Sequence, residues 1–358
     1  MVYHILVASY ANEVSTLAFD PDAPTPSLSL TSTISVGHHP SWITPHPTDK
    51  SIVFTALEQD DGRLIVFKVG DEGRLTHVCE RSTGGKDPCS LVTLSEPDEI
   101  LVANYSSGAF TAVPITSSPS YISTTSPAPT ITFSGTGPNT DRQEASHLHQ
   151  VAPHPSYPEL LVPDLGADKV RRLVRKDGQW EEKGTVDFKP GSGPRHVAFH
   201  GDVMYTVLEL SSELAAHRLP PLPAPATLLD TVPTMAAPPP PEHAAAMLAA
   251  EVLAPPPSAA FPRALVYVSN RNDPSPLGDT IAVFGAVDAG GKIALVREVR
   301  SGLKHLRGMV FGGADDRWLV AGGAQGGGVK VFERVEGGAG LKEVASVELE
   351  APTGFLWL

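Results

Sequence analysis

Arg195 and Glu209 are the first residues in the chain whose types and placement suggest chemistry, because each directly flanks a short apolar run. A guanidinium group can stabilise the negative charge that develops on a carbonyl oxygen during ester hydrolysis, or hold a carboxylate or phosphate. A carboxylate can orient a water molecule or accept its proton. The pair could therefore serve a hydrolytic site, provided that the fold brings the two side chains together.

The stretch between these two residues predicts a tight antiparallel hairpin. Residues 196–199 and 203–208 form two apolar runs, and residues 200–202, with the sequence His-Gly-Asp, supply the turn between them. In an antiparallel pair the start of one strand lies beside the end of the other. Arg195 and Glu209 are therefore expected at the same rim of a sheet, either as part of a site or as a purely structural ion pair.

This hairpin recurs along the chain with a period of about fifty residues. Each unit has an inner run, a second and a third apolar run, and a weaker fourth. The inner runs begin at Ser41, Cys89, His149, Arg195, Ala246, Arg307 and Gly354. Four short strands per unit predict an all-β fold, a seven-bladed β-propeller with four-stranded antiparallel blades, in which residues 1–358 form a single domain.

The two ends of the chain are expected to share one blade. Residues 354–358 form an inner run that lacks outer strands, whereas residues 3–10 form a second run that lacks an inner strand. Pairing these two segments would close the ring and remove two exposed strand edges.

Two Pro-rich stretches, residues 114–138 and 219–262, are predicted to be insertions. Such compositions favour extended loops that cannot pack a core of their own. We expect these loops to decorate the surface. The alternative is that they form a rim or lid over the mouth that holds Arg195, since connections from an outer strand to the next inner strand emerge there.

The composition restricts the partners of the protein. A net charge of −13 would repel nucleic acids and anionic membrane surfaces, so neither is an expected partner. The two cysteines, Cys79 and Cys89, argue for a reducing compartment. Residues 1–10 lack the features of a signal peptide, and no run of about 18 apolar residues is present. We expect a cytoplasmic protein.

One mouth of the ring should receive the start of every inner strand and the end of every second strand. A purely structural repeat would place similar residues there, but these positions hold a chemically mixed set, as a binding site on a repeat scaffold would. The strand starts give Ser41, Cys89, His149, Arg195, His243, Arg307 and Gly354. The strand ends give Asn12, Glu58, Asn104, Asp164, Glu209, Arg271 and Gln325.

His147 and His149 lie two residues apart, so in a strand both side chains would point to one face, as metal ligands can. No third ligand stands at a motif spacing, and no phosphate-binding G-x-x-x-x-G-K-[ST] pattern is present. We therefore expect no metal and no other cofactor.

Several segments resemble a known family. GPRHVAFH followed by YTVLEL, then VYVSNR, then LRGMVF with a downstream AGGAQ are similar to the seven-bladed propeller lactonase family, which includes bacterial 6-phosphogluconolactonase and fungal 3-carboxy-cis,cis-muconate lactonizing enzyme. The resemblance covers nearly the whole chain. It implies that the catalytic residues are His149, Arg195, Glu209 and Arg271.

The phosphogluconolactonase branch of this family has further matching features, which the muconate enzymes lack. They are His196, Leu210, the pair Arg307-Gly308 and Gln325. Candidate substrate-binding residues come from this match and from the predicted mouth. They are Arg307, Gln325, Asn104, Glu58 and His147.

The leading hypothesis is a metal-independent lactonase that hydrolyses a sugar-acid lactone or a similar small anionic lactone. Arg195, with Arg271 or Arg307, would stabilise the oxyanion or hold the anionic group of the substrate. His149 or Glu209 would activate the water. The alternative enzyme is a cycloisomerase that uses the same cations to close a carboxymuconate to its lactone. A third hypothesis is a propeller that binds a partner without chemistry, although the repeats lack the G-H and W-D signatures of WD40 units.

Overall fold

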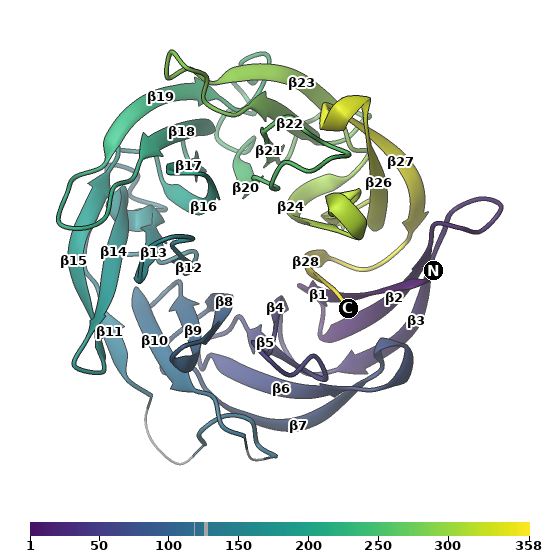
Figure 1. Cartoon of the computed structure of the whole chain (residues 1–358), viewed down its shortest axis with the longest axis horizontal. Coiled ribbons are helices and arrows are strands. Elements are labelled where there is room, and N and C mark those ends of the chain that lie inside the picture. The colour runs from purple at the N-terminus through teal and green to yellow at the C-terminus, as the bar shows by residue number, and fades with distance from the viewer. Residues whose placement is uncertain (118, 125–127) are drawn as a thin grey trace.

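The computed structural model describes residues 1–117, 119–124 and 128–358, and its strands form seven four-stranded antiparallel sheets arranged in a ring (Figure 1). In each sheet the strand nearest the ring axis is called the inner strand. The predicted all-β, seven-bladed β-propeller is confirmed.

Each sheet extends from its inner strand outward through three further strands. In this order the first sheet has β28 (Pro352–Trp357), β1 (Tyr3–Ser9), β2 (Glu13–Asp20) and β3 (Ser27–Ser35), and the second has β4 (Pro40–Pro45), β5 (Ile52–Leu57), β6 (Arg63–Val69) and β7 (Leu75–Ser82). The third has β8 (Pro88–Ser95), β9 (Asp98–Asn104), β10 (Ala109–Pro114) and β11 (Thr130–Thr132), and the fourth has β12 (Ala152–Pro153), β13 (Glu159–Asp164), β14 (Lys169–Lys176) and β15 (Gln179–Asp187). The fifth has β16 (Pro194–His200), β17 (Val203–Leu208), β18 (Glu213–Arg218) and β19 (Thr227–Pro233), and the sixth has β20 (Ala249–Leu253), β21 (Leu265–Asn270), β22 (Thr280–Gly285) and β23 (Ala294–Arg300). The seventh has β24 (Lys304–Gly312), β25 (Trp318–Gly326), β26 (Val329–Val335) and β27 (Gly340–Val347).

Short 3-10 helices connect some of these strands in the described part of the chain. They are η1 (Asp71–Gly73), η2 (Leu165–Ala167), η3 (Ala314–Asp316) and η4 (Glu336–Gly338). Within the same ranges, no helix has the length and apolar character needed to cross a membrane.

The core lies between neighbouring blades. The second strands β5, β13, β17 and β21 are buried at every position, because each packs on both faces against an adjacent blade. Tyr205 and Val207 of β17, for example, share one hydrophobic cluster with Val266 and Val268 of β21. No blade could bury both of its faces alone, so the stability of each blade depends on its neighbours.

The ring closes in the sheet that contains both chain ends, as predicted (Figure 1). The inner strand β28 pairs with β1 in a register that sets Phe355 opposite Val7. Phe355 is buried in a cluster with strands of the seventh sheet, and the Trp357 ring meets the edge of Tyr3 at 5.7 Å between ring centroids. The C-terminal strand is therefore part of the core.

The Pro-rich stretches contain strands as well as loops. Residues 114–138 include β11, and residues 219–262 include β19 and the inner strand β20. Residues 118 and 125–127 of the first stretch lie outside the described residues. Strand β11 has three residues and β20 is Ala-rich, so local composition gives little β signal, and pairing with a neighbouring strand decides the structure.

Only part of each stretch lies at the mouth that holds Arg195. Strand β10 begins beside the end of β9 at this mouth and leads away from it, so its last residue, Pro114, lies at the opposite end of the blade, and β11 pairs with the first half of β10. The segments that return to the mouth are residues 133–151 and 234–248, which each precede an inner strand. These two segments are called the rim connections.

Candidate active site

Glu209 is the centre of a buried cluster of arginines. Its carboxylate oxygen Oε2 lies 2.9 Å from Arg195 Nε and 2.9 Å from Arg271 Nη2, and its Oε1 accepts a hydrogen bond from Arg142 Nη2 at 2.6 Å. Burial alone would raise the pKa of Glu209, but the charges of Arg271, Arg195 and Arg142 outweigh it and hold the pKa well below its usual range. The carboxylate is therefore ionised and contacts three arginines.

A repeated irregularity of the inner strands positions the residues at this mouth. The pairing of β16 with β17 shifts between Pro194 and His196, so that Arg195 is the extra residue of a β-bulge. Equivalent bulges place Ser41 in β4, Cys89 in β8 and Arg307 in β24. These are four of the predicted strand starts, and their shared register brings their side chains to the same level of the tunnel.

Three of the predicted strand starts require correction. In the fourth sheet β12 begins at Ala152, so His149 lies in the rim connection that precedes it. In the sixth sheet β20 begins at Ala249, and the bulge spans Ala250 and Glu251, so His243 lies in a rim connection away from the inner strand. In the first sheet the bulge falls at Thr353 and not at Gly354.

The matching positions on the second strands are the residues that directly follow each strand. Glu58 follows β5, Glu209 follows β17 and Arg271 follows β21, as expected. Tyr10 follows β1 and Tyr105 follows β9, and both line the site although the sequence reasoning did not select them.

His149 brings an imidazole to the same mouth from a rim connection. Its backbone N–H donates to the Pro163 carbonyl at 2.9 Å, and its ring Nδ1 lies 3.2 Å from Nε2 of His196. Burial lowers the pKa of His149 well below its ordinary value, and the charge of Arg195 lowers it further. The ring is therefore neutral at neutral pH, with one nitrogen able to accept a proton.

Arg307 and Glu58 lie near each other at the mouth and form only a long ion pair. Arg307 Nη2 lies 3.9 Å from Glu58 Oε1, and the guanidinium stacks over the Tyr10 ring at 5.0 Å from its centroid. Burial would lower the pKa of Arg307, but Tyr10, Glu58 and Glu209 raise it above its usual value, so the group stays charged. Its donors have no hydrogen-bonded partner among the described residues and can bind an anion.

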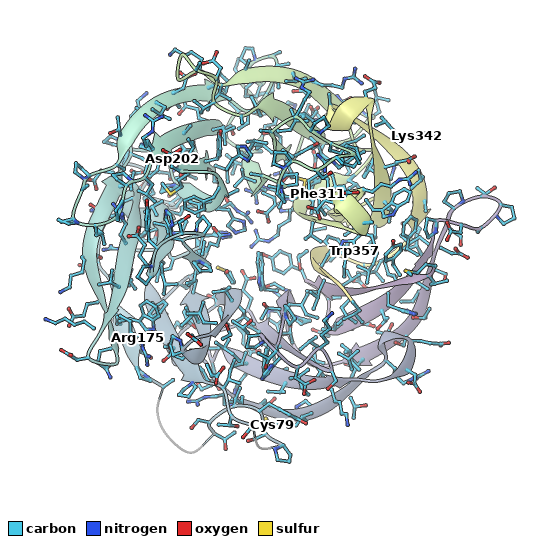
Figure 2. All side chains as sticks on the ribbon, viewed as in Figure 1. Cys79, Arg175, Asp202, Phe311, Lys342 and Trp357 are labelled. Atoms are coloured by element: carbon cyan, nitrogen blue, oxygen red, sulfur yellow. The ribbon has the colours of Figure 1, made fainter. Side chains whose placement is uncertain are left out.

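These side chains line a cavity of about 450 Å³ at the mouth of the tunnel. Figure 2 shows side chains that project from the inner strands into the centre of the ring. The lining consists of Tyr10, Glu58, Tyr105, Arg142, His149, Glu209, Ala245, Ala246, Leu248, Arg271, Asn272, His305 and Arg307. Four guanidinium groups, counting Arg195 beneath, meet two carboxylates, so the cavity attracts anions although the whole chain is acidic.

Three predicted substrate-binding residues do not line this cavity. Asn104 is buried inside its blade, where its amide donates to Ala109 O and Thr111 Oγ1. His147 stacks on Tyr105 at 4.4 Å between ring centroids and contacts Glu144. It therefore packs against a residue that lines the cavity without lining the cavity itself. Gln325 is exposed near the end of β25. Glu58 and Arg307, in contrast, do line the cavity.

Arg142 and His305 are lining residues that sequence reasoning missed, along with the two tyrosines. Arg142 belongs to a rim connection, and His305 has a left-handed backbone with φ of 56° near the start of β24. Burial lowers the pKa of His305 to about 4, with further lowering by Arg271 and Arg307. No apolar periodicity marks either residue.

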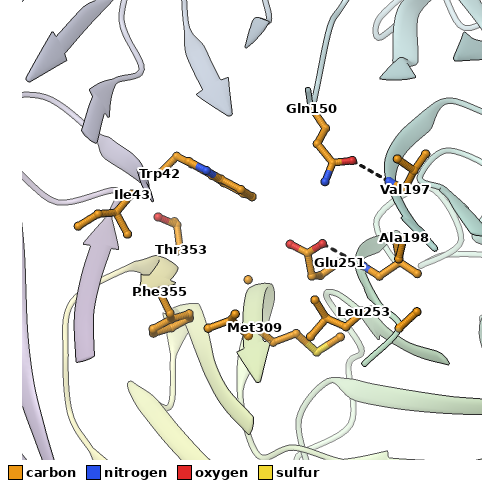
Figure 3. Close-up of a pocket in the computed structure, with 15 residues that line it drawn as sticks. Trp42, Ile43, Gln150, Val197, Ala198, Glu251, Leu253, Met309, Thr353 and Phe355 are labelled. Atoms are coloured by element: carbon orange, nitrogen blue, oxygen red, sulfur yellow. Dashed lines mark hydrogen bonds between the residues drawn. The ribbon is translucent and has the colours of Figure 1, made fainter. Parts of the chain in front are cut away.

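A layer of buried side chains closes the floor of the cavity. Arg195, His196 and Cys89 are 2%, 0% and 3% exposed. Beyond them the tunnel holds a second cavity of about 290 Å³, which shares no lining residue with the first (Figure 3). Burial raises the pKa of the Cys89 thiol, so it stays protonated and is a poor nucleophile. Among the described residues, no group of three His, Cys, Asp or Glu side chains is arranged to hold a metal ion.

Fold and site together define a seven-bladed β-propeller with a cationic, histidine-containing pocket at one mouth of its tunnel. The family described as "Lactonase, 7-bladed beta-propeller" matches residues 4–357, and the chain belongs to this family.

Individual relatives agree with this assignment. The 6-phosphogluconolactonase of Bacillus subtilis is 29% identical over 287 residues, which are 79% of this chain and 77% of the relative. The periplasmic gluconolactonase of Pseudomonas aeruginosa superposes with a TM-score of 0.81 at 23% identity, over 100% of this chain and 99% of that one. A Lactobacillus plantarum protein superposes with a TM-score of 0.83 at 22% identity, over 100% of both chains. At these identities the structural likeness concerns the fold.

Replacing Glu209 by glutamine should lower the free energy of unfolding at pH 7 by about 3 kcal/mol, because three arginines lose their buried counter-charge. The folded-state pKa of Glu209 is depressed, so its stabilisation is complete above the unfolded pKa of about 4.3 and is lost as the pH falls below it. Urea titrations at several pH values should therefore show a difference between E209Q and wild type that shrinks in acid. The exposed Glu350→Gln is the control, and a pH-independent difference would contradict the assigned ionisation.

Proposed function

We propose that the protein is a lactonase that hydrolyses a small anionic lactone, with a phosphorylated sugar-acid lactone as the leading substrate. The observation that carries this proposal is a neutral imidazole, His149, on the wall of a cavity with an excess of guanidinium groups. A phosphate or carboxylate of the substrate would bind the arginines, and the imidazole would accept a proton from the attacking water. The activity named for the Bacillus subtilis relative supports the same substrate class.

In the proposed reaction His149 is the general base and Glu209 is not. Both carboxylate oxygens of Glu209 contact arginines, whose charges hold its pKa low, so it is a poor proton acceptor. His149 is neutral and forms no ion pair with another described residue, so one of its ring nitrogens can accept a proton. His149 would take a proton from water as the water oxygen attacks the carbonyl carbon. The negative charge then develops on the carbonyl oxygen, where Arg271 or Arg307 would stabilise it. The C–O bond of the ring breaks, and the protonated His149 returns the proton to the leaving oxygen.

The test is turnover of 6-phosphogluconolactone, gluconolactone and a carboxymuconate, each followed separately. We expect hydrolysis of the phosphorylated lactone, and replacement of His149 by asparagine should lower kcat about 100-fold with a smaller change in KM. His154→Asn is the matched control. His154 is also a buried histidine, but its Nδ1 accepts from Ser156 N in a turn outside the cavity.

The other outcomes decide between the remaining functions. Cyclisation of the carboxymuconate without lactone hydrolysis would replace the lactonase with a cycloisomerase. Absence of turnover on all three compounds would favour a propeller that only binds. Full activity of His149→Asn would remove this residue as the base.

A further inference from the structure

The second cavity of the tunnel contains one charged side chain. Its lining comes mostly from the inner strands and is mostly apolar, with Trp42, Met309 and Phe355 among its walls (Figure 3). The exception is Glu251, which is 6% exposed. Burying a carboxylate is costly unless it is paired, so the position of Glu251 requires a partner.

That partner is His196, and through it Glu251 is connected to the first cavity. Glu251 Oε1 lies 2.7 Å from His196 Nδ1 and also accepts from Val252 N at 3.0 Å. His196 Nε2 lies 3.2 Å from His149 Nδ1. Three residues from three different segments thus form one line of contacts between the two cavities. The bulge in β20 provides its far end, since it places Glu251 between the paired residues Ala249 and Val252.

The positions of the protons along this line follow from the carboxylate. An ionised carboxylate can only accept, so the 2.7 Å contact requires a hydrogen on Nδ1 of His196. Burial lowers the pKa of His196, so the ring is neutral and its Nε2 is an acceptor. His149 Nδ1 must then donate to it, which leaves Nε2 of His149 without a proton. Arg195 Nη1 lies 3.5 Å from the same His196 nitrogen, but it donates to Ala250 O at 2.5 Å.

We infer that Glu251 is a positioning residue that acts through His196 to hold His149 in the tautomer whose Nε2 accepts a proton from water. This inference rests on the proposed function only for its effect on turnover. The same line of contacts would share the positive charge when His149 is protonated, because the hydrogen on its Nδ1 can pass to His196 Nε2 beside the carboxylate. In that step Nδ1 of His149 loses the hydrogen and Nε2 of His196 gains it, so the positive charge moves to the His196 ring, whose Nδ1 faces the Glu251 carboxylate.

Two substitutions of Glu251 separate the two effects. Glu251→Gln keeps an acceptor for the His196 N–H but removes the charge. Glu251→Leu removes both. Glu159→Gln is the matched control, because Glu159 is also buried and paired with an arginine, Arg172 at 2.8 Å, in a blade wall away from both cavities.

The first experiment is nitrogen NMR of the full chain with 15N-labelled histidine, with signals assigned by His149→Asn and His196→Asn. Wild type and E251Q should show His149 and His196 each as the single tautomer with hydrogen on Nδ1. E251L should show a mixture of tautomers, or the other tautomer, at His149. An unchanged His149 spectrum in E251L would overturn the inference whether or not the protein hydrolyses lactones.

The second experiment measures kcat and KM on the lactone that wild type hydrolyses. We expect kcat to fall about 100-fold in E251L, because a base in the wrong tautomer cannot accept the proton. In E251Q we expect a fall of about tenfold, because the tautomer is kept but the negative charge that stabilises the protonated histidines is lost. KM should be nearly unchanged in both. Glu159→Gln should keep the wild-type kcat. If no lactone is hydrolysed but the tautomers change as expected, the proposed function fails and the positioning role stands. Wild-type kcat in E251L would show that the line of contacts does not serve catalysis.

Discussion

Replacing Arg307 by alanine should lower kcat/KM for an anionic lactone about 1000-fold while the ring stays folded. The guanidinium lines the cavity, is held charged by Tyr10 and Glu58, and approaches its nearest carboxylate only to 3.9 Å. Its donors are therefore available to a substrate anion or to the developing oxyanion. Because this weak ion pair contributes little to folding, the loss should appear in turnover rather than in stability.

The measurement is steady-state kinetics beside thermal unfolding monitored by circular dichroism. Arg307→Lys should recover part of the activity, because it keeps the charge but loses the planar set of donors. Arg334→Ala is the matched control. Arg334 is also buried and stacked on aromatic rings, with Phe261 at 4.0 Å, but it lies outside the cavity lining. Near wild-type kcat/KM in Arg307→Ala would exclude Arg307 from the site.

Removing residues 354–358 should leave no cooperatively folded ring. This segment contains most of β28, so its loss exposes the edge of β1 and removes Phe355 and Trp357 from the core. Truncation of one large buried aromatic side chain already costs about 3–5 kcal/mol, and the whole stability of a protein is commonly about 5–15 kcal/mol. We therefore expect the truncated chain to lose its sharp thermal transition.

Near-ultraviolet circular dichroism and urea titration would measure this loss. Deletion of Leu358 alone is the control, because this residue is 44% exposed and lies beyond the end of β28, with its backbone N–H donating to His4 O. A truncated chain that melts like the full chain would show that β28 is not needed for closure.

The strands could be predicted because the chain repeats a strong local signal. Strands such as β17 and β21 are buried on both faces and appear in the sequence as continuous apolar runs. The turn after His200 is equally clear, since Gly201 adopts a φ of 60° there and His200 pairs with Val203. Four-stranded repeats then leave few alternatives to a propeller.

The site is harder to predict, because a shift of one residue along a strand moves a side chain to the other face. Asn104 is predicted as a mouth residue, but it is the last residue of β9 and matches Asn270 of β21. Each of the two accepts from a threonine that directly follows the outer strand of the preceding blade, and donates to a threonine of its own blade. The residue that faces the cavity is the next one, Tyr105 or Arg271.

Arg142, unlike His149, could not be inferred from the periodicity of the chain. Arg142 reaches Glu209 from a segment that belongs to another blade, and only the path of the chain around the mouth brings the two together. The shift from Ala246 to Ala249 at the start of β20 has the related cause that an Ala-rich run does not mark its own ends. For the same reason, the sequence does not indicate that Glu251 lies in a bulge.

The buried residues Arg195, His196 and Cys89 beneath the first cavity affect how small molecules enter and leave it. The two cavities share no lining residue, so we expect a lactone bound in the first cavity and the acid made from it to pass through the same mouth of the ring. The released acid, which carries one more negative charge than its lactone, therefore leaves past the same arginines that admit the next molecule, and the two compete for one entrance.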